Sequence, residues 1–265
     1  MLDGDAIWMK LQAVRDRRPL VHCITNFVSM EVTANALLAL GASPAMVHAA
    51  EEVEDFQAVA DALVVNIGTL SPDWVTAMEL ASARAEALNK PWVLDPVAVG
   101  ATPYRTRVAA ELARRGPSVV RANASEILAL AGAASGPTRG VDSSHASEDA
   151  LQAAQELARV LGRVVAVTGA VDHVTDGTRH ARIANGDPLM PRVTALGCAL
   201  SAVVGAFLAV DDNPLEATVA ALSVFGLAGE RAARRAGGPG TLRVVLIDEL
   251  AGLDRAAVVE GAKLG

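Results

Sequence analysis

The amino-acid sequence predicts an α/β protein with a mostly parallel central sheet flanked by helices on both faces. Short β-branched and apolar runs, typical of buried strands, alternate along the chain with longer segments of helical periodicity. This alternation is typical of right-handed βαβ units, whose strands run parallel and whose helices cover the sheet. With 265 residues, of which 52% are hydrophobic, the chain can bury a substantial core, and we expect one domain over residues 1–265.

Start signals in the sequence support several of the expected elements. Strands are predicted at 63–67, 92–94, 118–120 and 164–167, and helices between them at 72–88, 104–114, 124–130 and 146–161. Ser71, Pro72 and Asp73 supply a cap, a first-turn proline and an early acid for the first of these helices. The stretch 132–140 is the most loop-like, and from 197 to 236 two long helical patterns are split at 211–214.

Composition and charge exclude several kinds of partner. The formal net charge of −7 argues against nucleic acid, and no apolar stretch reaches the ~18 residues of a membrane span. The two cysteines, Cys23 and Cys198, form neither a disulfide framework nor a metal-ligand cluster. Because the first residues lack a basic segment followed by an apolar run, we expect no signal peptide and a cytoplasmic protein.

Polar residues occur where the predicted strands end. Asn66, Asp95, Arg121 and Thr168 each follow or close one of these strands. In open parallel sheets, ligands bind beyond the carboxyl ends of the strands. The sequence therefore predicts a polar binding site at this edge, although each residue alone is more often turn chemistry. His22 and His48 have no identifiable partner and are expected to be structural.

The segment 193–201 places a turn of small residues and Cys198 at the start of an apolar helix, expected over 199–210. The first turn of a helix leaves backbone N–H groups without intrahelical partners, and the helix dipole adds positive potential there. Such a turn favours phosphate or another anion, and it biases a cysteine towards thiolate. The alternative is a helix start with a small buried thiol.

Phosphoryl transfer needs an anion cradle, cationic or metal neutralisation and an activated hydroxyl. The chain has no G-x-x-x-x-G-K-[ST] segment, which excludes a P-loop. Arg121 is suited to bind phosphate oxygens with its planar fork, or it forms a surface salt bridge. Asp95 and Glu126 are candidate Mg²⁺ ligands, since Mg²⁺ prefers oxygen donors, although Glu126 also suits a helix first turn.

Six segments of the chain form a recognisable series. They are 19–26 (PLVHCITN), 34–46 (ANALLALGASPAM), 66–70 (NIGTL), 94–102 (LDPVAVGAT), 121–126 (RANASE) and 167–169 (VTG). In this order they resemble the hydroxyethylthiazole kinase family, thiamine-salvage enzymes of the ribokinase-like superfamily. The resemblance implies a ribokinase-like three-layer α/β/α domain that transfers the ATP γ-phosphoryl group to 4-methyl-5-(2-hydroxyethyl)thiazole. It also implies Mg²⁺ as cofactor and a homotrimer with sites shared between subunits.

The resemblance also implies roles for individual residues. The turn at 194–198 would be the anion cradle, with Gly197 and Cys198 catalytic. The residues expected to bind ATP are Arg121, Asn123 and Thr168. The residues expected to hold the metal are Asp95 and Glu126, the latter in an Asn-x-x-Glu segment that begins at Asn123. The residues expected to contact the thiazole alcohol are Asn26, Met46 and Ala195.

The chain departs from the family pattern in the cradle itself. The family usually reads Thr-Gly-Thr-Gly-Cys, where this chain has Thr194, Ala195, Leu196, Gly197 and Cys198. Glycine is favoured where backbone approaches a phosphate or adopts positive φ, so the change bears on rate and substrate fit more than on fold.

Cys198 also separates the possible activities. Most ribokinase-like enzymes carry Asp at this position as a base, whereas thiazole kinases carry Cys, which at an ordinary pKa of about 8.5 is a modest base. Hydroxymethylpyrimidine kinases, pyridoxal kinases and ATP- or ADP-dependent NAD(P)H-hydrate dehydratases share the fold but usually have an acid there. A non-catalytic ligand-binding relative is supported only by Ala195 and Leu196.

Overall fold

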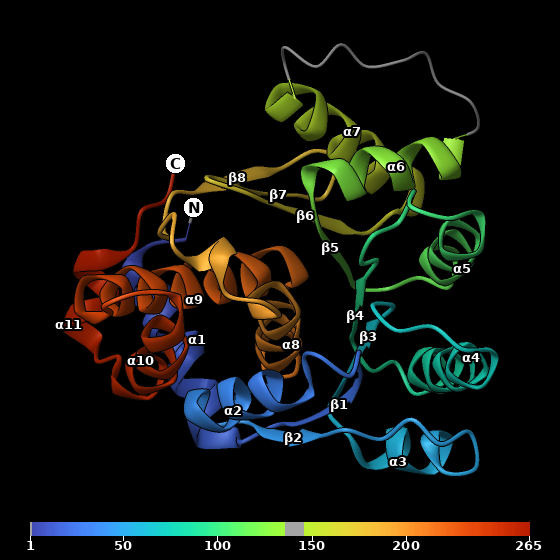
Figure 1. Ribbon diagram of the computed structural model, residues 1–265, viewed down its shortest axis with the longest axis horizontal. Helices are drawn as coiled ribbons and strands as arrows, with labels where there is room; N and C mark the ends of the chain where they lie inside the picture. Colours follow the sequence, from blue (N-terminus) through green and yellow to red (C-terminus); the bar gives the residue numbers. More distant parts are fainter. Residues whose placement is uncertain (1, 136–145) are drawn as a thin grey trace.

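The computed structural model describes residues 2–135 and 146–265 and contains one central sheet (Figure 1). Within these residues its order is β2-β1-β3-β4-β5-β6-β7-β8. The strands are β1 (Leu20–Ile24), β2 (Ser43–Ala45), β3 (Ala62–Asn66), β4 (Trp92–Asp95), β5 (Val119–Asn123), β6 (Val164–Thr168), β7 (Asp172–Thr175) and β8 (His180–Ile183). The pairs from β2 to β6 are parallel, and β7 and β8 add antiparallel strands at one edge.

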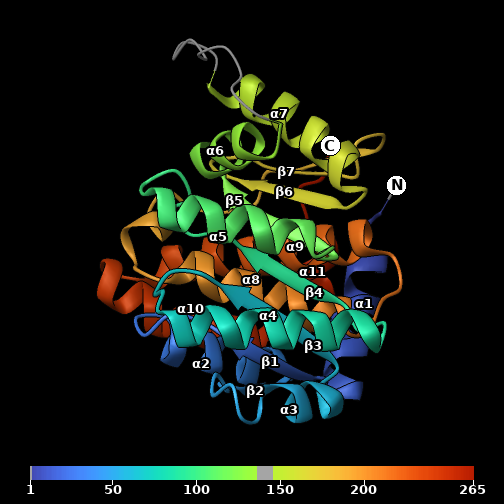
Figure 2. The same cartoon turned by 90° about the vertical axis from the view of Figure 1, so that its right-hand side faces the viewer.

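Helices cover both faces of this sheet, so the molecule has three layers (Figures 1 and 2). One layer contains α3 (Val53–Val59), α4 (Pro72–Ala87), α5 (Pro103–Arg114), α6 (Ala124–Ser135) and α7 (Ala146–Leu161). The other contains α1 (Gly4–Arg17), α2 (Met30–Leu40), α8 (Leu196–Leu208), α9 (Pro214–Arg235), α10 (Pro239–Gly252) and α11 (Arg255–Gly261). The predicted fold class is confirmed.

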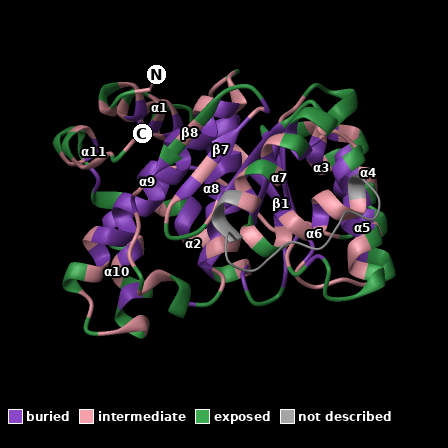
Figure 3. Ribbon diagram, turned by 90° about the horizontal axis from the view of Figure 1, so that it is seen from above, coloured by how far each residue is buried: buried purple, intermediate pink, exposed green. Residues whose placement is uncertain are grey.

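The hydrophobic core is divided by the sheet into two clusters. One lies among α4 to α7 and the sheet face beneath them, and the other among α1, α2, α8, α9, α10 and the opposite face. Figure 3 shows that α8 and α9 are the most continuously buried helices. Strands β3 and β4 are buried along their whole length, as expected of parallel strands covered on both sides.

Several expected boundaries were wrong by a few residues. Helix α6 extends to Ser135 instead of ending at 130, because Gly132 lies among alanines that favour helix; residues 136–140 of the expected loop lie outside the described residues. Helix α8 begins at Leu196, three residues earlier than expected. Strand β5 continues through Arg121 to Asn123, so these residues belong to the strand and do not follow it.

Two further expectations concern histidines and membranes. His22 is fully buried, and its ring nitrogens lie 2.9 Å from Gln57 Oε1 and from the Val47 carbonyl, which are the partners that the sequence did not identify. His48 packs against the ring of Trp74. No helix in the described part of the chain combines the length and apolar character that crossing a bilayer requires.

Candidate functional site

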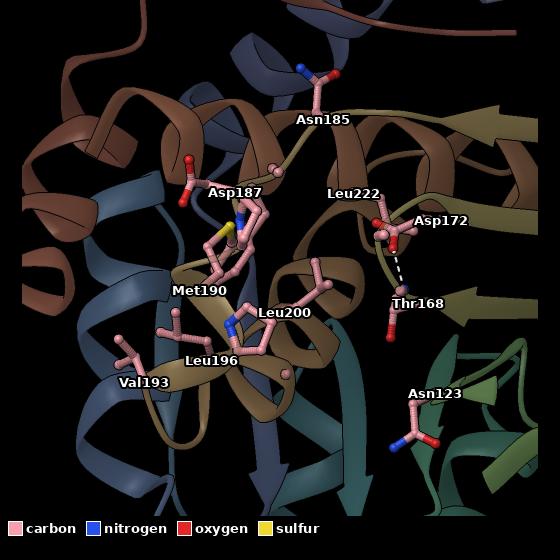
Figure 4. A pocket seen from close by; sticks show the side chains of 18 of the residues that line it. Asn123, Thr168, Asp172, Asn185, Asp187, Met190, Val193, Leu196, Leu200 and Leu222 are labelled. Atoms are coloured by element: carbon pink, nitrogen blue, oxygen red, sulfur yellow. Dashed lines mark hydrogen bonds between the residues drawn. The ribbon is translucent and has the colours of Figure 1, made fainter. Parts of the chain in front are cut away.

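A cavity of about 740 Å³ lies at the carboxyl ends of β5 and β6, where the first turn of α8 and the middle of α9 face them (Figure 4). Half of the predicted site residues line it, namely Arg121, Asn123, Thr168, Ala195 and Gly197. Its remaining wall comes from the turn after β6 and from the segment 185–191. The cavity therefore joins parts of the chain that the sequence separates by about a hundred residues.

Arg121 connects the sheet to helix α8 at the floor of this cavity. The parallel pairing of β5 with β6 places Asn123 beside Thr168, and the Arg121 guanidinium reaches the same edge. Its Nη1 donates to the Gly197 carbonyl at 3.1 Å, and its Nη2 donates to the Thr168 hydroxyl. Arg121 is only 8% exposed. A buried cation beside the positive end of a helix favours an anion between them.

The first turn of α8 is built on an unusual backbone conformation. Ala195 is the N-cap residue, with φ of 66° and ψ of 4°, in the left-handed region that glycine adopts most easily. Its side chain offers no cap to the first-turn N–H groups, which leaves those donors for a ligand. At Gly197 a Cβ would lie 3.0 Å from Arg121 Nη1, so glycine makes room for the guanidinium.

Asp172 is a cavity residue that the sequence analysis missed. It is 8% exposed, and its Oδ1 accepts the backbone N–H of Gly169 at 2.9 Å, which holds the turn after Thr168. Burial raises the pKa of Asp172 to about 6, although Gly169 and Arg121 lower it. The available signal was an acid three residues after the Thr-Gly pair, but a sequence does not show that this acid is buried.

Cys198 lies outside the cavity lining, at one end of a buried polar network. Asn26 Nδ2 donates to Cys198 Sγ at 3.3 Å and to Asn66 Oδ1 at 2.9 Å. Asn66 Nδ2 in turn donates to Asp95 Oδ2 at 2.8 Å, because β3 and β4 pair these two residues directly. Ser201 also donates its hydroxyl to this oxygen of Asp95, at 2.8 Å.

This network determines the charge state of the cysteine. Burial, followed by the negative charge of Asp95, raises the pKa of Cys198 above its ordinary value despite the hydrogen bond from Asn26. The expected bias towards thiolate is therefore wrong, because burial and the negative charge of Asp95 favour the protonated thiol. The raised pKa of Cys198 agrees with the expectation that this cysteine is a modest base.

Asn123 and Glu126 cap helix α6 reciprocally. Asn123 Oδ1 accepts the N–H of Glu126 at 2.9 Å, while Glu126 Oε2 accepts the N–H of Asn123 at 3.0 Å. Glu126 Oε1 also accepts the N–H of Ala98 at 2.8 Å, in the loop after β4. The carboxylate is thus fixed between two strand ends.

Asp95 and Glu126 do not line the cavity and remain candidate Mg²⁺ ligands, for a site that substrate would complete. Burial raises the pKa of Asp95 to about 6, and the charge of Glu126 adds to this shift, so the two carboxylates interact. The described residues contain no group of three or more His, Cys, Asp or Glu suited to a metal. Mg²⁺ commonly takes only one or two carboxylates, together with waters and substrate phosphates.

Met46 follows the edge strand β2, and its half-buried side chain packs against the core beneath α2. Neither Met46 nor Asn26 lines the cavity. Two of the three residues expected to contact the alcohol therefore follow β1 and β2, away from β5 and β6, whereas the third, Ala195, lines the cavity.

Comparison with known proteins identifies relatives of the chain. The model of the hydroxyethylthiazole kinase family matches residues 11–256. A hydroxyethylthiazole kinase from Cereibacter sphaeroides is 58% identical over 254 residues, covering 96% of each chain. One from Arabidopsis thaliana is 51% identical over 258 residues, covering 97% of this chain and 94% of its own.

Solved structures extend the comparison to the fold. A hydroxyethylthiazole kinase protein from Pyrococcus horikoshii matches with a TM-score of 0.92 at 47% identity, covering 98% of both chains. A pyridoxal kinase from Staphylococcus aureus matches with a TM-score of 0.62 at 19% identity, covering 79% of this chain and 87% of its own. The second likeness shows a shared ribokinase-like fold alone, as the sequence predicts. The chain belongs to the hydroxyethylthiazole kinase family.

Proposed function

We propose that this protein catalyses the Mg²⁺-dependent transfer of the ATP γ-phosphoryl group to the hydroxyl of 4-methyl-5-(2-hydroxyethyl)thiazole, a step of thiamine salvage. The observation that carries this proposal is the convergence of Arg121 and the α8 N-terminus on one cavity. Both present positive potential to an anion, and phosphoryl transfer depends chiefly on positioning and charge stabilisation. The names of relatives that are 51% and 58% identical supply the substrate class.

The cavity is lined by side chains that suit the phosphates of a nucleoside triphosphate. Arg121 would neutralise phosphate oxygens, and Thr168 and Asn123 would donate or accept hydrogen bonds beside it. The backbone N–H groups after Ala195 would bind the transferring phosphoryl group, and Gly197 leaves room for the Arg121 guanidinium beside them. We assign these residues to ATP binding and to the anion cradle.

Asp95 and Glu126 would hold Mg²⁺ together with its waters. When bound, the ion would supply positive charge beside the phosphates of ATP, whose γ-phosphoryl group is transferred to the alcohol while ADP leaves. In the protein alone, the capping contacts with Ala98 and Asn123 keep the Glu126 carboxylate oriented, so binding requires little reordering.

Cys198, Asn26, Met46 and Ala195 would contact the alcohol. Because burial and Asp95 raise the pKa of Cys198 and so favour its thiol form, we assign it to positioning the hydroxyl and not to removing its proton early. A loose transition state makes little demand on a base, because the nucleophile loses its proton late. The thioether of Met46 suits the face of a small heteroaromatic ring.

We also propose a homotrimer, in which each alcohol site is completed by a neighbouring subunit. Phe27 and Val28 directly follow Asn26 and are 67% and 66% exposed, although large apolar side chains favour burial. Leu38 on α2 and Val244 on α10 are also exposed, on helices that contact each other. The molar mass measured by light scattering should be three times that of the chain, and Phe27→Asp should lower it.

A turnover assay tests the proposed activity directly. Purified protein with ATP and Mg²⁺ should phosphorylate the thiazole alcohol at least about a hundredfold more efficiently than hydroxymethylpyrimidine or pyridoxal. Glu126→Gln should need more Mg²⁺ for half-maximal rate, because one carboxylate charge is lost. Efficient turnover of pyridoxal in place of the thiazole would contradict the proposed substrate. A Mg²⁺ dependence unchanged in Glu126→Gln would leave Glu126 only its capping role.

A further inference from the structure

One wall of the cavity is a segment without regular strand structure, from Asn185 to Pro188, which continues into the short helix η2 (Met190–Arg192). Figure 4 shows Asn185, Asp187 and Met190 along this side of the cavity. Because the backbone of such a segment lacks the hydrogen bonds of a strand ladder, its position depends on contacts with the elements packed behind it.

Helix α9 presents a face of small residues to the back of this wall. A Cβ at Gly226 would lie 2.8 Å from both the Cβ and the carbonyl oxygen of Asn185. A Cβ at Gly229 would overlap the sulfur of Met190. The two glycines, one helical turn apart, therefore let the wall rest directly on the helix backbone.

The next residue of α9, Glu230, binds the wall through hydrogen bonds. Its Oε1 accepts the N–H of Gly186 at 3.0 Å and Nδ2 of Asn185 at 3.1 Å. Both oxygens also accept from Lys263 Nζ, at 2.8 and 2.9 Å. Glu230 is 6% exposed, and although burial raises its pKa, the hydrogen bonds from Lys263, Gly186 and Asn185 hold the pKa below its ordinary value.

The segment around Lys263 binds the same wall residue from the other side. Asn185 Nδ2 donates to the Gly261 carbonyl at 2.9 Å, and Asn185 Oδ1 accepts the N–H of Lys263 at 2.9 Å. Every polar atom of the Asn185 side chain is thus engaged. The carboxylate of Glu230, the ammonium of Lys263 and the amide of Asn185 form one connected network.

We propose that Glu230, with Lys263, is a positioning pair that fixes the cavity wall at Asn185 and Gly186 and thereby sets the affinity for ATP. The proposal rests on the proposed function, in which this cavity binds the nucleotide. Neither side chain lines the cavity, so the pair acts through the wall and not on the reacting atoms. Loss of the pair would weaken nucleotide binding and leave the transfer step at the α8 N-terminus nearly unchanged.

Glu249 provides a matched control on the neighbouring helix α10. It is 3% exposed, and it accepts hydrogen bonds from Arg231 Nε at 2.6 Å and from Arg235, both on α9. It is therefore another buried acid paired with cations on the same helix region. None of these three residues lines the cavity or contacts the wall segment through a hydrogen bond.

The experiment compares Glu230→Gln, Lys263→Met and Glu249→Gln with the wild type. Binding of a non-hydrolysable ATP analogue is measured by calorimetry, and KM for ATP, KM for the alcohol and kcat by steady-state assay. In Glu230→Gln we expect the Kd of the analogue and the KM for ATP to rise about tenfold, with kcat within about twofold. Lys263 is half exposed, so Lys263→Met should raise the Kd of the analogue and the KM for ATP less than Glu230→Gln does.

The control separates positioning from general stability. Glu249→Gln should lower the free energy of unfolding and leave the KM for ATP unchanged. Equal rises of the KM for ATP in Glu230→Gln and Glu249→Gln would overturn the proposal, as would wild-type Kd values in both Glu230→Gln and Lys263→Met. A wild-type protein that binds no ATP analogue would overturn the proposed function itself, whereas wild-type binding with unaffected variants overturns this proposal alone.

Discussion

The guanidinium of Arg121 on β5 donates to the carbonyl of Gly197 on α8, with 3.1 Å between Nη1 and the oxygen. The same group lies 3.8 Å from Asp95 Oδ2 on β4. One buried cation therefore joins two strands of the sheet to the helix that begins at the cavity. Asp95 balances part of the charge of Arg121, and an anion bound beside this cation and the positive helix terminus would be stabilised by both.

Replacing Arg121 should accordingly weaken ATP use. We expect Arg121→Ala to raise the KM for ATP and lower kcat, with kcat/KM falling at least about a hundredfold, since a charge-assisted contact to phosphate is lost. Arg121→Lys should recover only part, because a single ammonium cannot replace the fork. Steady-state kinetics measure both variants.

Arg15→Ala is the control, since Arg15 donates to the Leu253 carbonyl away from the cavity. Wild-type kinetics in Arg121→Ala would refute the proposed role of Arg121.

Much of this arrangement could be predicted from the sequence. The alternation of strands and helices predicts the parallel sheet, and the rule that ligands bind at carboxyl ends brings Arg121, Asn123 and Thr168 together. The position of Asp172 could not be predicted in this way, because its role depends on the burial of a turn. The contact of Glu230 with Gly186 depends on how α9 packs against a distant segment. Likewise, the pKa of Cys198 depends on Asp95, about a hundred residues earlier in the chain.

The departure at Ala195 acquires a physical meaning from its backbone. A left-handed conformation costs a residue with a Cβ about 1–2 kcal/mol. Glycine avoids this cost, but its greater freedom in the unfolded chain cancels part of the gain in stability. We expect Ala195→Gly to raise the free energy of unfolding by up to about 1 kcal/mol and to raise kcat, because the methyl group stands beside the anion cradle. Urea unfolding and kcat measure the two effects. A lower free energy of unfolding in Ala195→Gly would contradict the inference that the backbone at Ala195 is strained.

Leu196 responds differently, although it also departs from the family pattern. It is 5% exposed and belongs to the core cluster around α8 and α9. Leu196→Thr should therefore lower the free energy of unfolding by about 1–3 kcal/mol, through lost apolar contacts and a buried hydroxyl. Urea unfolding of this variant and of Ala195→Gly should give changes of opposite sign. A Leu196→Thr variant as stable as the wild type would show that this position tolerates a polar group.

Asp172 gives the protein a pH dependence of stability. Its pKa is about 6 in the folded protein and 3.8 ordinarily, so the folded state binds its proton more tightly than the unfolded state does. The stability from this site is fully present below about pH 4 and is lost as the pH rises through 6. Asp172→Asn should thus be more stable than the wild type by about 3 kcal/mol at pH 7.5, because no buried charge forms.

The measurement is urea unfolding of both proteins, without nucleotide, between pH 4 and 8. The difference between them should shrink as the pH falls below 6. Asp172→Asn keeps an oxygen for the N–H of Gly169, so the turn itself is preserved. A difference that stays constant across this range would show that Asp172 does not titrate there.

Cys198 tests whether positioning or proton removal dominates the reaction. Burial and the nearby Asp95 raise the pKa of the thiol, so little thiolate exists at neutral pH. We therefore expect Cys198→Ala to keep measurable activity, with kcat lowered by less than about a hundredfold and the KM for the alcohol raised. Cys198→Asp should change kcat only modestly, because a new carboxylate supplies a base but adds negative charge beside Asp95 and the phosphates.

The fully buried Cys23 serves as the control, since Cys23→Ala should leave kcat and the KM for the alcohol unchanged. A correctly folded but completely inactive Cys198→Ala would show that the thiol takes the proton after all.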